Sequence, residues 1–191
     1  MTVVLTSTVQ RWIGLNSDTK PTTPPAGSTF YETDTGATSV YDGTAWQLQL
    51  GTVVLKATKT ITYANPGTGA AGTSTTIFTV TGDVLIVRLV PFCSTSLTET
   101  AGTPTLALGV IGNTAILLGA TTATAIDSGK FWLDTSPAEV GAVAILAALI
   151  DIACTANIAC LVGGTNNINA GVIRYDLFWR PLSSDGLVVA A

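Results

Sequence analysis

Apolar and polar residues alternate along much of the chain after residue 50, which is the pattern of half-buried β-strands. The alternation is clearest at residues 172–180, where large apolar side chains fall on one side, and it recurs at residues 52–63. Residues 84–90 are instead apolar on nearly both sides, as in a strand that is covered on both faces. These segments predict strands of a β-rich domain that spans residues 51–191.

Shorter β-prone runs, separated by glycine and asparagine turns, extend this pattern. They lie at residues 105–111, 115–118, 130–133, 152–154 and 159–162. Residues 76–81 and 84–90 flank Gly82-Asp83 and predict a hairpin or a corner, whereas residues 140–150 fit both a helix and a buried strand. Roughly eight strands without a long amphipathic helix predict an all-β sandwich, and we favour a jelly roll over an immunoglobulin-like sandwich.

The start of the chain has a different composition. Residues 1–28 contain the proline-rich run Lys20-Pro21-Thr22-Thr23-Pro24-Pro25. Prolines at this density favour an extended chain without internal hydrogen bonds. We therefore expect residues 1–28 to form an extended arm, which becomes ordered by lying on a neighbouring subunit.

Residues 29–50 predict a small three-stranded β-meander. The turn signals Asp34-Thr35-Gly36 and Asp42-Gly43 separate its short β-prone runs, and Asp-Gly between strands is a strong hairpin signal. Aromatic side chains would supply its apolar contacts. Because so small a sheet is marginally stable alone, we expect it to pack on something else.

Charged residues make up only 10% of the chain, whereas a typical soluble domain has about 25%. Because obligate interfaces are depleted in charge, this composition favours a subunit covered by neighbours over a threonine-rich monomer. The net charge of −4 comes without a basic cluster, which argues against direct nucleic-acid binding.

The longest apolar stretch is far shorter than the ~20 residues of a membrane helix, and the start lacks a secretory pattern. We expect no membrane contact and assembly in a cytoplasm.

Residue types that carry catalysis are scarce. The chain has no histidine, which excludes ordinary Ser-His-Asp and Cys-His arrangements. Cys93, Cys154 and Cys160 are widely spaced and predict buried reduced thiols in preference to a zinc site or a disulfide framework. The glycines of residues 67–72 satisfy G-x-G-x-x-G, but a β-rich run follows where a nucleotide site needs a helix, so we expect a flexible loop.

Glu32, Asp34 and Asp42 are the remaining candidates for chemistry. A carboxylate trio brought together by the meander would suit Ca²⁺ or, at the right spacing, glycosidic cleavage. The favoured interpretation is that Asp34 and Asp42 start turns through bonds from their side chains to the backbone. We therefore expect no catalytic residue, no metal site and no cofactor.

Two parts of the chain resemble virion proteins of tailed bacteriophages. Residues 25–36, PAGSTFYETDTG, and residues 40–46, VYDGTAW, resemble a short module of many such proteins, in which a Y-x-T-D-T-G run precedes a Y-D-G-x-x-W run. Residues 78–84 and 173–186 are similar to phage jelly-roll proteins that decorate capsids or form fibre bases. The resemblance implies a virion component, often trimeric, with no catalytic residues to carry over.

These observations predict a non-enzymatic structural subunit of a phage particle, either a capsid decoration or cement protein or the base of a head fibre. The sandwich is expected to form a homotrimer, and aromatic residues are expected to anchor the N-terminal region to other virion proteins, above all the major capsid protein. These residues are Trp12, Phe30, Tyr31, Tyr41 and Trp46. The alternative is a tail or tail-fibre protein that binds a host-surface glycan through loops at the end of the sandwich. An enzyme such as a glycan depolymerase is the least favoured class.

Overall fold

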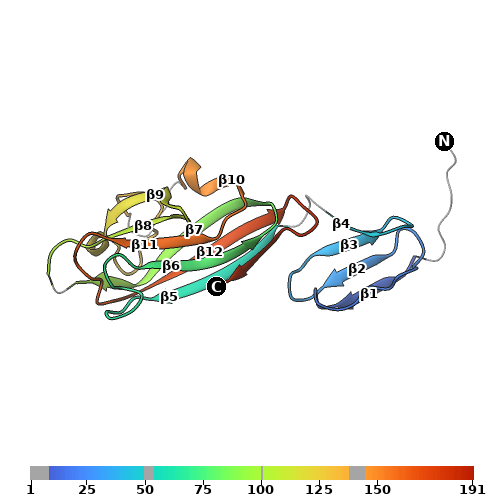
Figure 1. Ribbon diagram of the computed structural model, residues 1–191, viewed down its shortest axis with the longest axis horizontal. Coiled ribbons are helices and arrows are strands. Elements are labelled where there is room, and N and C mark those ends of the chain that lie inside the picture. Colours follow the sequence, from blue (N-terminus) through green and yellow to red (C-terminus); the bar gives the residue numbers. More distant parts are fainter. Residues whose placement is uncertain (1–8, 50–53, 100, 138–144) are drawn as a thin grey trace. The chain divides into compact units, whose positions relative to one another are not determined.

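The computed structural model describes residues 9–49, 54–99, 101–137 and 145–191. The chain divides into two compact units, Met1–Leu55 and Lys56–Ala191 (Figure 1). Both units are built from β-strands, and the described residues contain no α-helix, so the predicted all-β class is confirmed. The boundary between the units falls after Leu55, a few residues beyond the predicted change at residue 50.

The first unit contains one four-stranded sheet. Its strands are β1 (Arg11–Gly14), β2 (Thr29–Glu32), β3 (Thr38–Tyr41) and β4 (Trp46–Leu48), and they lie in chain order. Strands β2, β3 and β4 pair antiparallel, as expected of the meander that the turn signals predict. Strand β1 lies parallel to β2 at the edge of the sheet.

The described part of residues 1–28 differs from the free extended arm that its prolines predict. Residues 11–14 are a strand of the sheet, and Thr29 N donates a hydrogen bond to Gln10 O at 3.0 Å. After β1, the proline-rich run of residues 20–25 leads the chain back to the start of β2. The prolines do prevent regular structure in this run, but the backbone carbonyls of Pro21 and Thr22 accept hydrogen bonds from side chains of the sheet, as described below.

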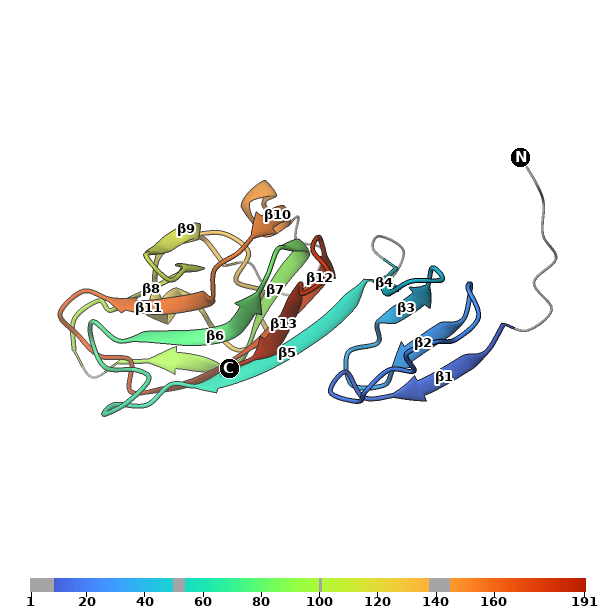
Figure 2. The same ribbon diagram turned by 45° about the vertical axis from the view of Figure 1, so that its right-hand side comes forward.

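The second unit consists of two sheets that face each other (Figures 1 and 2). The first sheet has the order β10 (Ile150–Cys154), β7 (Val84–Thr98), β12 (Ala170–Pro181) and β5 (Leu55–Thr62). The second has the order β13 (Leu187–Ala190), β6 (Ser74–Thr81), β11 (Ile158–Gly163), β8 (Thr105–Val110) and β9 (Asn113–Thr122). Two 3-10 turns, Ala123–Ala125 and Ala147–Leu149, lie in the long connection between β9 and β10.

The strand order identifies a jelly roll. Strands β8 and β9 are neighbours, and so are β7 with β10, β6 with β11, and β5 with β12. These nested pairs are what a long antiparallel ribbon produces when it is rolled so that successive pairs fall in opposite sheets. Strand β13 is an addition to this arrangement and extends the second sheet beside β6. The predicted jelly-roll sandwich is therefore confirmed.

Most predicted strands are present, with differences where the pattern is ambiguous. The turn at Gly82-Asp83 is a corner, because β6 and β7 belong to different sheets. Residues 130–133 form a single bridge, between Phe131 and Phe92, and not a strand. In residues 140–150 the described part forms a 3-10 turn that leads into β10, while residues 140–144 lie outside the described residues.

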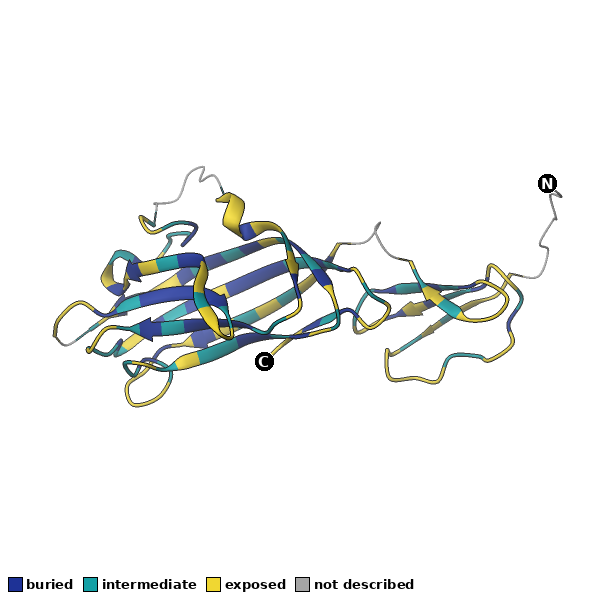
Figure 3. Cartoon of the chain, turned by 45° about the horizontal axis from the view of Figure 1, so that its top comes forward, coloured by how far each residue is buried: buried dark blue, intermediate teal, exposed yellow. Residues whose placement is uncertain are grey.

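Alternation along β12 builds the centre of the core. Ile173, Tyr175 and Leu177 have no exposed surface and Trp179 is 3% exposed, as their common side of the strand predicts. Figure 3 shows the same alternation as bands of buried and exposed residues along the strands. Burying each such side chain contributes about 1.5–3 kcal/mol, so this strand accounts for a large share of the stability of the sandwich.

A small polar network lies inside this core. The hydroxyl groups of Tyr63 and Tyr175 are 2.8 Å apart, and the Tyr63 hydroxyl is 3.1 Å from Cys160 Sγ. Burial raises the pKa of both tyrosines well above their ordinary value and also raises the pKa of the Cys160 thiol. These groups therefore stay neutral, and their mutual hydrogen bonds offset the cost of removing them from water.

Candidate interaction surfaces

Trp46 is the centre of an aromatic cluster on one side of the first sheet. Its ring centroid lies 5.8 Å from Trp12, 6.1 Å from Phe30 and 5.5 Å from Tyr41. The strand register brings these residues together, because Trp12 pairs with Phe30 and Tyr41 pairs with Trp46. The edge-to-face contacts with Trp12 and Phe30 are the arrangement that aromatic pairs prefer, each worth about 0.5–1.5 kcal/mol beyond burial.

The proline-rich run covers this aromatic cluster. Trp46 Nε1 donates a hydrogen bond to Pro21 O at 2.7 Å, and the Tyr41 hydroxyl donates to Thr22 O at 3.3 Å. Lys20 lies 5.0 Å from the centre of the Phe30 ring and forms a 2.9 Å ion pair with Glu32. The run thus closes a small core with the sheet, which explains why Phe30, Tyr41 and Glu32 are buried.

The five predicted anchoring residues do not share one surface. Trp12, Phe30, Tyr41 and Trp46 belong to the internal cluster, whereas Tyr31 points to the other side of the sheet and is 45% exposed. Phe30 and Tyr41 are buried and Trp12 and Trp46 are half-buried, so these four stabilise the unit, and Tyr31 is the most exposed of the five.

Ile13 is an exposed residue that the sequence reasoning missed. It pairs with Tyr31 across β1 and β2 and is 71% exposed, and Val9 and Leu15, which lie just before and just after β1, are also exposed. The sequence pattern could have identified Ile13, because Val9, Arg11, Ile13 and Leu15 alternate with Trp12 and Gly14 and would therefore lie on the other side of a strand. We call the surface formed by Val9, Ile13, Leu15 and Tyr31 the apolar strip.

The carboxylates of the first unit act in turns and ion pairs. Asp42 Oδ1 accepts hydrogen bonds from the backbone N–H groups of Thr44 and Ala45, both at 2.8 Å. These bonds, the one to Ala45 foremost, lower the pKa of Asp42. Asp34 accepts from the backbone N–H of Asn16 at 2.9 Å. Among the residues that the structure describes, no group of three metal-ligating side chains occurs.

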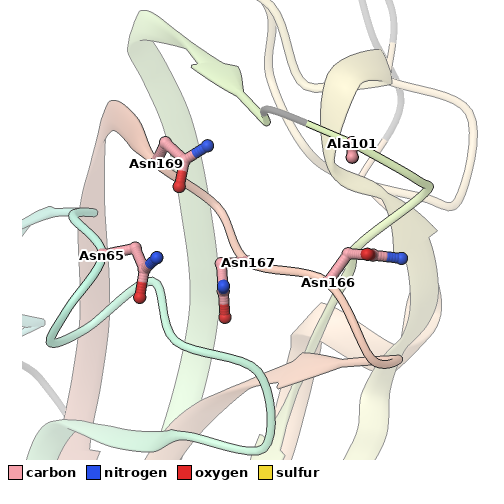
Figure 4. A pocket seen from close by; sticks show the side chains of 5 residues that line it. All are labelled: Asn65, Ala101, Asn166, Asn167 and Asn169. Carbon is pink, nitrogen blue, oxygen red and sulfur yellow. The ribbon is translucent and has the colours of Figure 1, made fainter.

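A pocket lined by asparagine side chains lies where three connections of the sandwich meet. Its volume is about 260 Å³. Its lining residues are Asn65, Ala101, Asn166, Asn167 and Asn169. Figure 4 shows Asn65, Asn167 and Asn169 close together, with the amide of Asn166 directed away from them. The pocket offers uncharged donors and acceptors, which is the chemistry that recognises hydroxyl groups.

Hydrogen bonds between the connections hold the pocket in place. Asn167 Oδ1 accepts from the backbone N–H of Ala71 at 2.8 Å, and the backbone N–H of Ile168 donates to Gly69 O at 2.8 Å. On the other side, the backbone N–H of Asn169 donates to Thr98 O at 2.7 Å. The glycine-rich segment that matches G-x-G-x-x-G thus supports the connection that carries Asn167, and strand β6 follows it where a phosphate site needs a helix.

The three cysteines are buried and unbridged, as the sequence predicts. Burial raises the pKa of Cys93, and its Sγ donates to the backbone oxygens of Thr95 and Ile126 at 3.1 and 3.3 Å. The three cysteines are therefore small core side chains, and the Cys93 thiol remains protonated because burial disfavours its thiolate.

In the part of the chain that the structure describes, no helix has the length and apolar character needed to cross a bilayer. No protein-family model matches the chain, and a search of curated proteins found no match. Its function is therefore argued from its own residues and geometry.

Proposed function

We propose that this chain is a non-enzymatic structural subunit of a tailed-phage particle, a capsid decoration or cement protein or the base of a head fibre. In this role the jelly roll forms a homotrimer, and the first unit attaches it to other virion proteins, with the major capsid protein as the main candidate. The low content of charged residues, 10% of the chain, suits a surface that is covered by neighbours.

One observation carries the proposal. The segment that resembles a phage virion module lies within a compact unit, Met1–Leu55, and a jelly roll follows that unit in the chain. The spacing of its motif residues has a physical basis here, because Asp34 and Asp42 organise the two turns while Phe30, Tyr41 and Trp46 make the internal cluster. A unit that completes its own core is suited to be carried as a module beside different domains.

Attachment is assigned to the apolar strip and not to the aromatic cluster. Ile13 and Tyr31 face outward as cross-strand partners and are 71% and 45% exposed. Exposed apolar neighbours of this kind are typical of contact sites, and β1 is also an edge strand that can accept a further strand. Covering the strip on a capsid subunit would add buried area at a joint of the shell and so oppose its disruption.

The test is made on particles of the phage that encodes the chain. We expect the protein to be present in purified particles, and particles without it to lose infectivity sooner on heating. Particles with Ile13→Asp/Tyr31→Asp should incorporate less of the protein, whereas a Thr122→Asp control at an exposed position of β9 should incorporate normally. Absence of the chain from purified particles would contradict the function, and unchanged heat resistance without the chain would contradict the cement role.

The asparagine pocket favours a second candidate function, a tail or tail-fibre protein that binds a host-surface glycan. The pocket lies at the loop end of the sandwich, where ligand sites are commonly formed on rigid scaffolds. Its volume of about 260 Å³ is near the lower end of small-molecule sites and suits one or two sugar rings. Neutral sugars offer many hydroxyl groups, which amides match as both donors and acceptors.

Glycan binding is tested with immobilised surface polysaccharide of the host. We expect Asn65→Ala/Asn169→Ala to weaken binding by about tenfold or more, because two amide groups that lie close together in the pocket are lost. The control is Asn16→Ala, an exposed asparagine of the first unit. No binding by the intact protein, or equal loss in the control, would remove this candidate.

A further inference from the structure

Half of the basic residues of the chain gather on the outward side of one sheet. The cations are Lys56 on β5, Arg88 on β7, and Arg174 and Arg180 on β12. On β12 the two arginines alternate with the buried Tyr175 and Trp179, and the register places Arg174 opposite Phe92 and Arg88 opposite Phe178. We call Lys56, Arg88, Arg174, Arg180 and the intervening Asp176 the cationic face.

Asp176 is the one carboxylate on β5, β7 and β12, all of which the structure describes in full, while the fourth strand of the sheet, β10, carries Asp151. Its Oδ1 is 2.9 Å from Lys56 Nζ and accepts from the Thr58 hydroxyl at 2.8 Å. Its Oδ2 accepts from Arg174 Nε at 2.9 Å. Both carboxylate oxygens are thus engaged, and the five residues of the cationic face carry a formal charge of +3.

Two aromatic rings lie among these cations. Arg88 Cζ is 4.6 Å and Lys56 Nζ is 5.5 Å from the centre of the Phe178 ring, and Arg174 Cζ is 5.3 Å from the centre of the Phe92 ring. Cations therefore occupy the ring faces on which the bases of a single-stranded nucleic acid would need to stack. Arginine and aromatic side chains placed side by side are instead characteristic of the centres of protein interfaces.

The rest of the molecule has the opposite charge. The whole chain carries −4, and because the cationic face carries +3, the remaining residues carry −7. Another copy of the chain is therefore a partner of matching charge. Two copies related by a two-fold axis through this face would bring its cations against each other, so a favourable contact must join different surfaces of the two copies.

We propose that the cationic face binds a net-acidic surface of a second copy of this chain, in a head-to-tail contact that closes a ring of three or more subunits. This inference rests on the proposed function, which needs self-association of the sandwich, and it adds the surface and the symmetry of that association. A head-to-tail contact cannot close with two copies. It is therefore compatible with the proposed trimer and incompatible with a two-fold dimer.

The test is the mass of the intact chain by light scattering at two salt concentrations. Raising NaCl from about 0.05 M to about 0.5 M shortens the screening length from about 14 Å to about 4 Å and should weaken the contact. Arg88→Glu should raise the dissociation constant of self-association by about tenfold or more at low salt. The matched control is Arg11→Glu, which changes the net charge equally at an exposed position of the first unit.

The outcomes separate this inference from the proposed function. A trimer or larger ring at low salt that both salt and Arg88→Glu dissociate, but Arg11→Glu does not, supports the cationic face as the contact. An oligomer that neither treatment changes, or a two-fold dimer, overturns the inference and leaves the structural function standing. A monomer in every condition overturns both. Binding of a short single-stranded DNA that depends on Arg88 would replace the second copy as the occupant.

Discussion

Trp46 is the residue on which the first unit depends most. Its ring contacts three other aromatic rings, and its indole N–H reaches a carbonyl of the proline-rich run. A unit of this size has a small core, so the loss of one large side chain destabilises the whole unit. Gly14 is a second residue on which this packing depends, because a Cβ at this position would lie 2.9 Å from the Phe30 ring and would displace it.

Trp46→Leu should therefore unfold the first unit and leave the second intact. The substitution removes three ring contacts and a hydrogen bond, a loss of about 3–5 kcal/mol. Limited proteolysis followed by mass spectrometry should show rapid cleavage within residues 11–48 and an unchanged fragment of residues 56–191. Ile13→Ala, at a 71% exposed position, serves as the control and should leave cleavage unchanged. Equal protection in Trp46→Leu would disprove the internal role of the cluster.

The buried tyrosine pair makes the second unit sensitive to alkaline pH. Burial raises the pKa of Tyr63 and Tyr175 well above the ordinary value of about 10, so the folded state holds protons that the unfolded chain releases. This stability is complete below about pH 10 and is lost as the pH rises toward the folded-state pKa, by up to about 1.4 kcal/mol per pH unit for each tyrosine.

Tyr175→Phe should reduce this pH dependence, because one of the two ionising groups is removed while Tyr63 keeps its contact with Cys160. The measurement is urea unfolding of the protein at several values between pH 9 and pH 11. Tyr31→Phe, at an exposed position, is the control and should behave as the unmodified chain. The idea fails if Tyr175→Phe loses stability with pH as steeply as the control.

At the scale of elements, local sequence patterns predicted most of the strands. The strands that were missed depend on contacts between distant parts of the chain or lack a clear pattern. Alternation identified β12, and the Asp-Gly signal identified the meander, because both depend on neighbouring residues. Strand β1 was missed since its parallel pairing with β2 depends on contacts across the sheet, above all Trp12 with Trp46. Strand β13 was missed because the short run Leu187–Ala190 has no clear alternation.

The central position of β12 predicts a strong effect of truncating its inward side chains. Leu177→Ala should lower the free energy of unfolding of the second unit by about 2–5 kcal/mol, because a fully buried leucine leaves a cavity. Val189→Ala on the edge strand β13, where the side chain is 46% exposed, should change it by less than about 0.5 kcal/mol. Denaturant titration checks both, and similar costs at the two positions would contradict the assigned core.

At the scale of the whole molecule, the sequence predicted the fold class, but it did not predict which side chains the fold leaves exposed. The five aromatic residues were chosen for their chemistry, but the fold directs four of them inward and leaves Tyr31 beside Ile13. The cations looked scattered because Lys56, Arg88 and Arg174 are far apart in sequence. Strand order and register bring them onto one sheet, and neither follows from local pattern. The asparagine pocket likewise depends on how three loops meet.

The central claim is that this chain works as a self-associating subunit through its jelly roll. It is tested most directly by light scattering on the purified intact chain and on a chain that lacks residues 1–55. The account predicts a stable oligomer, a trimer in the simplest case, that persists when the first unit is removed. A well-behaved monomer for both chains at all accessible concentrations would contradict it, and would favour a binding module that is attached to its particle by another protein.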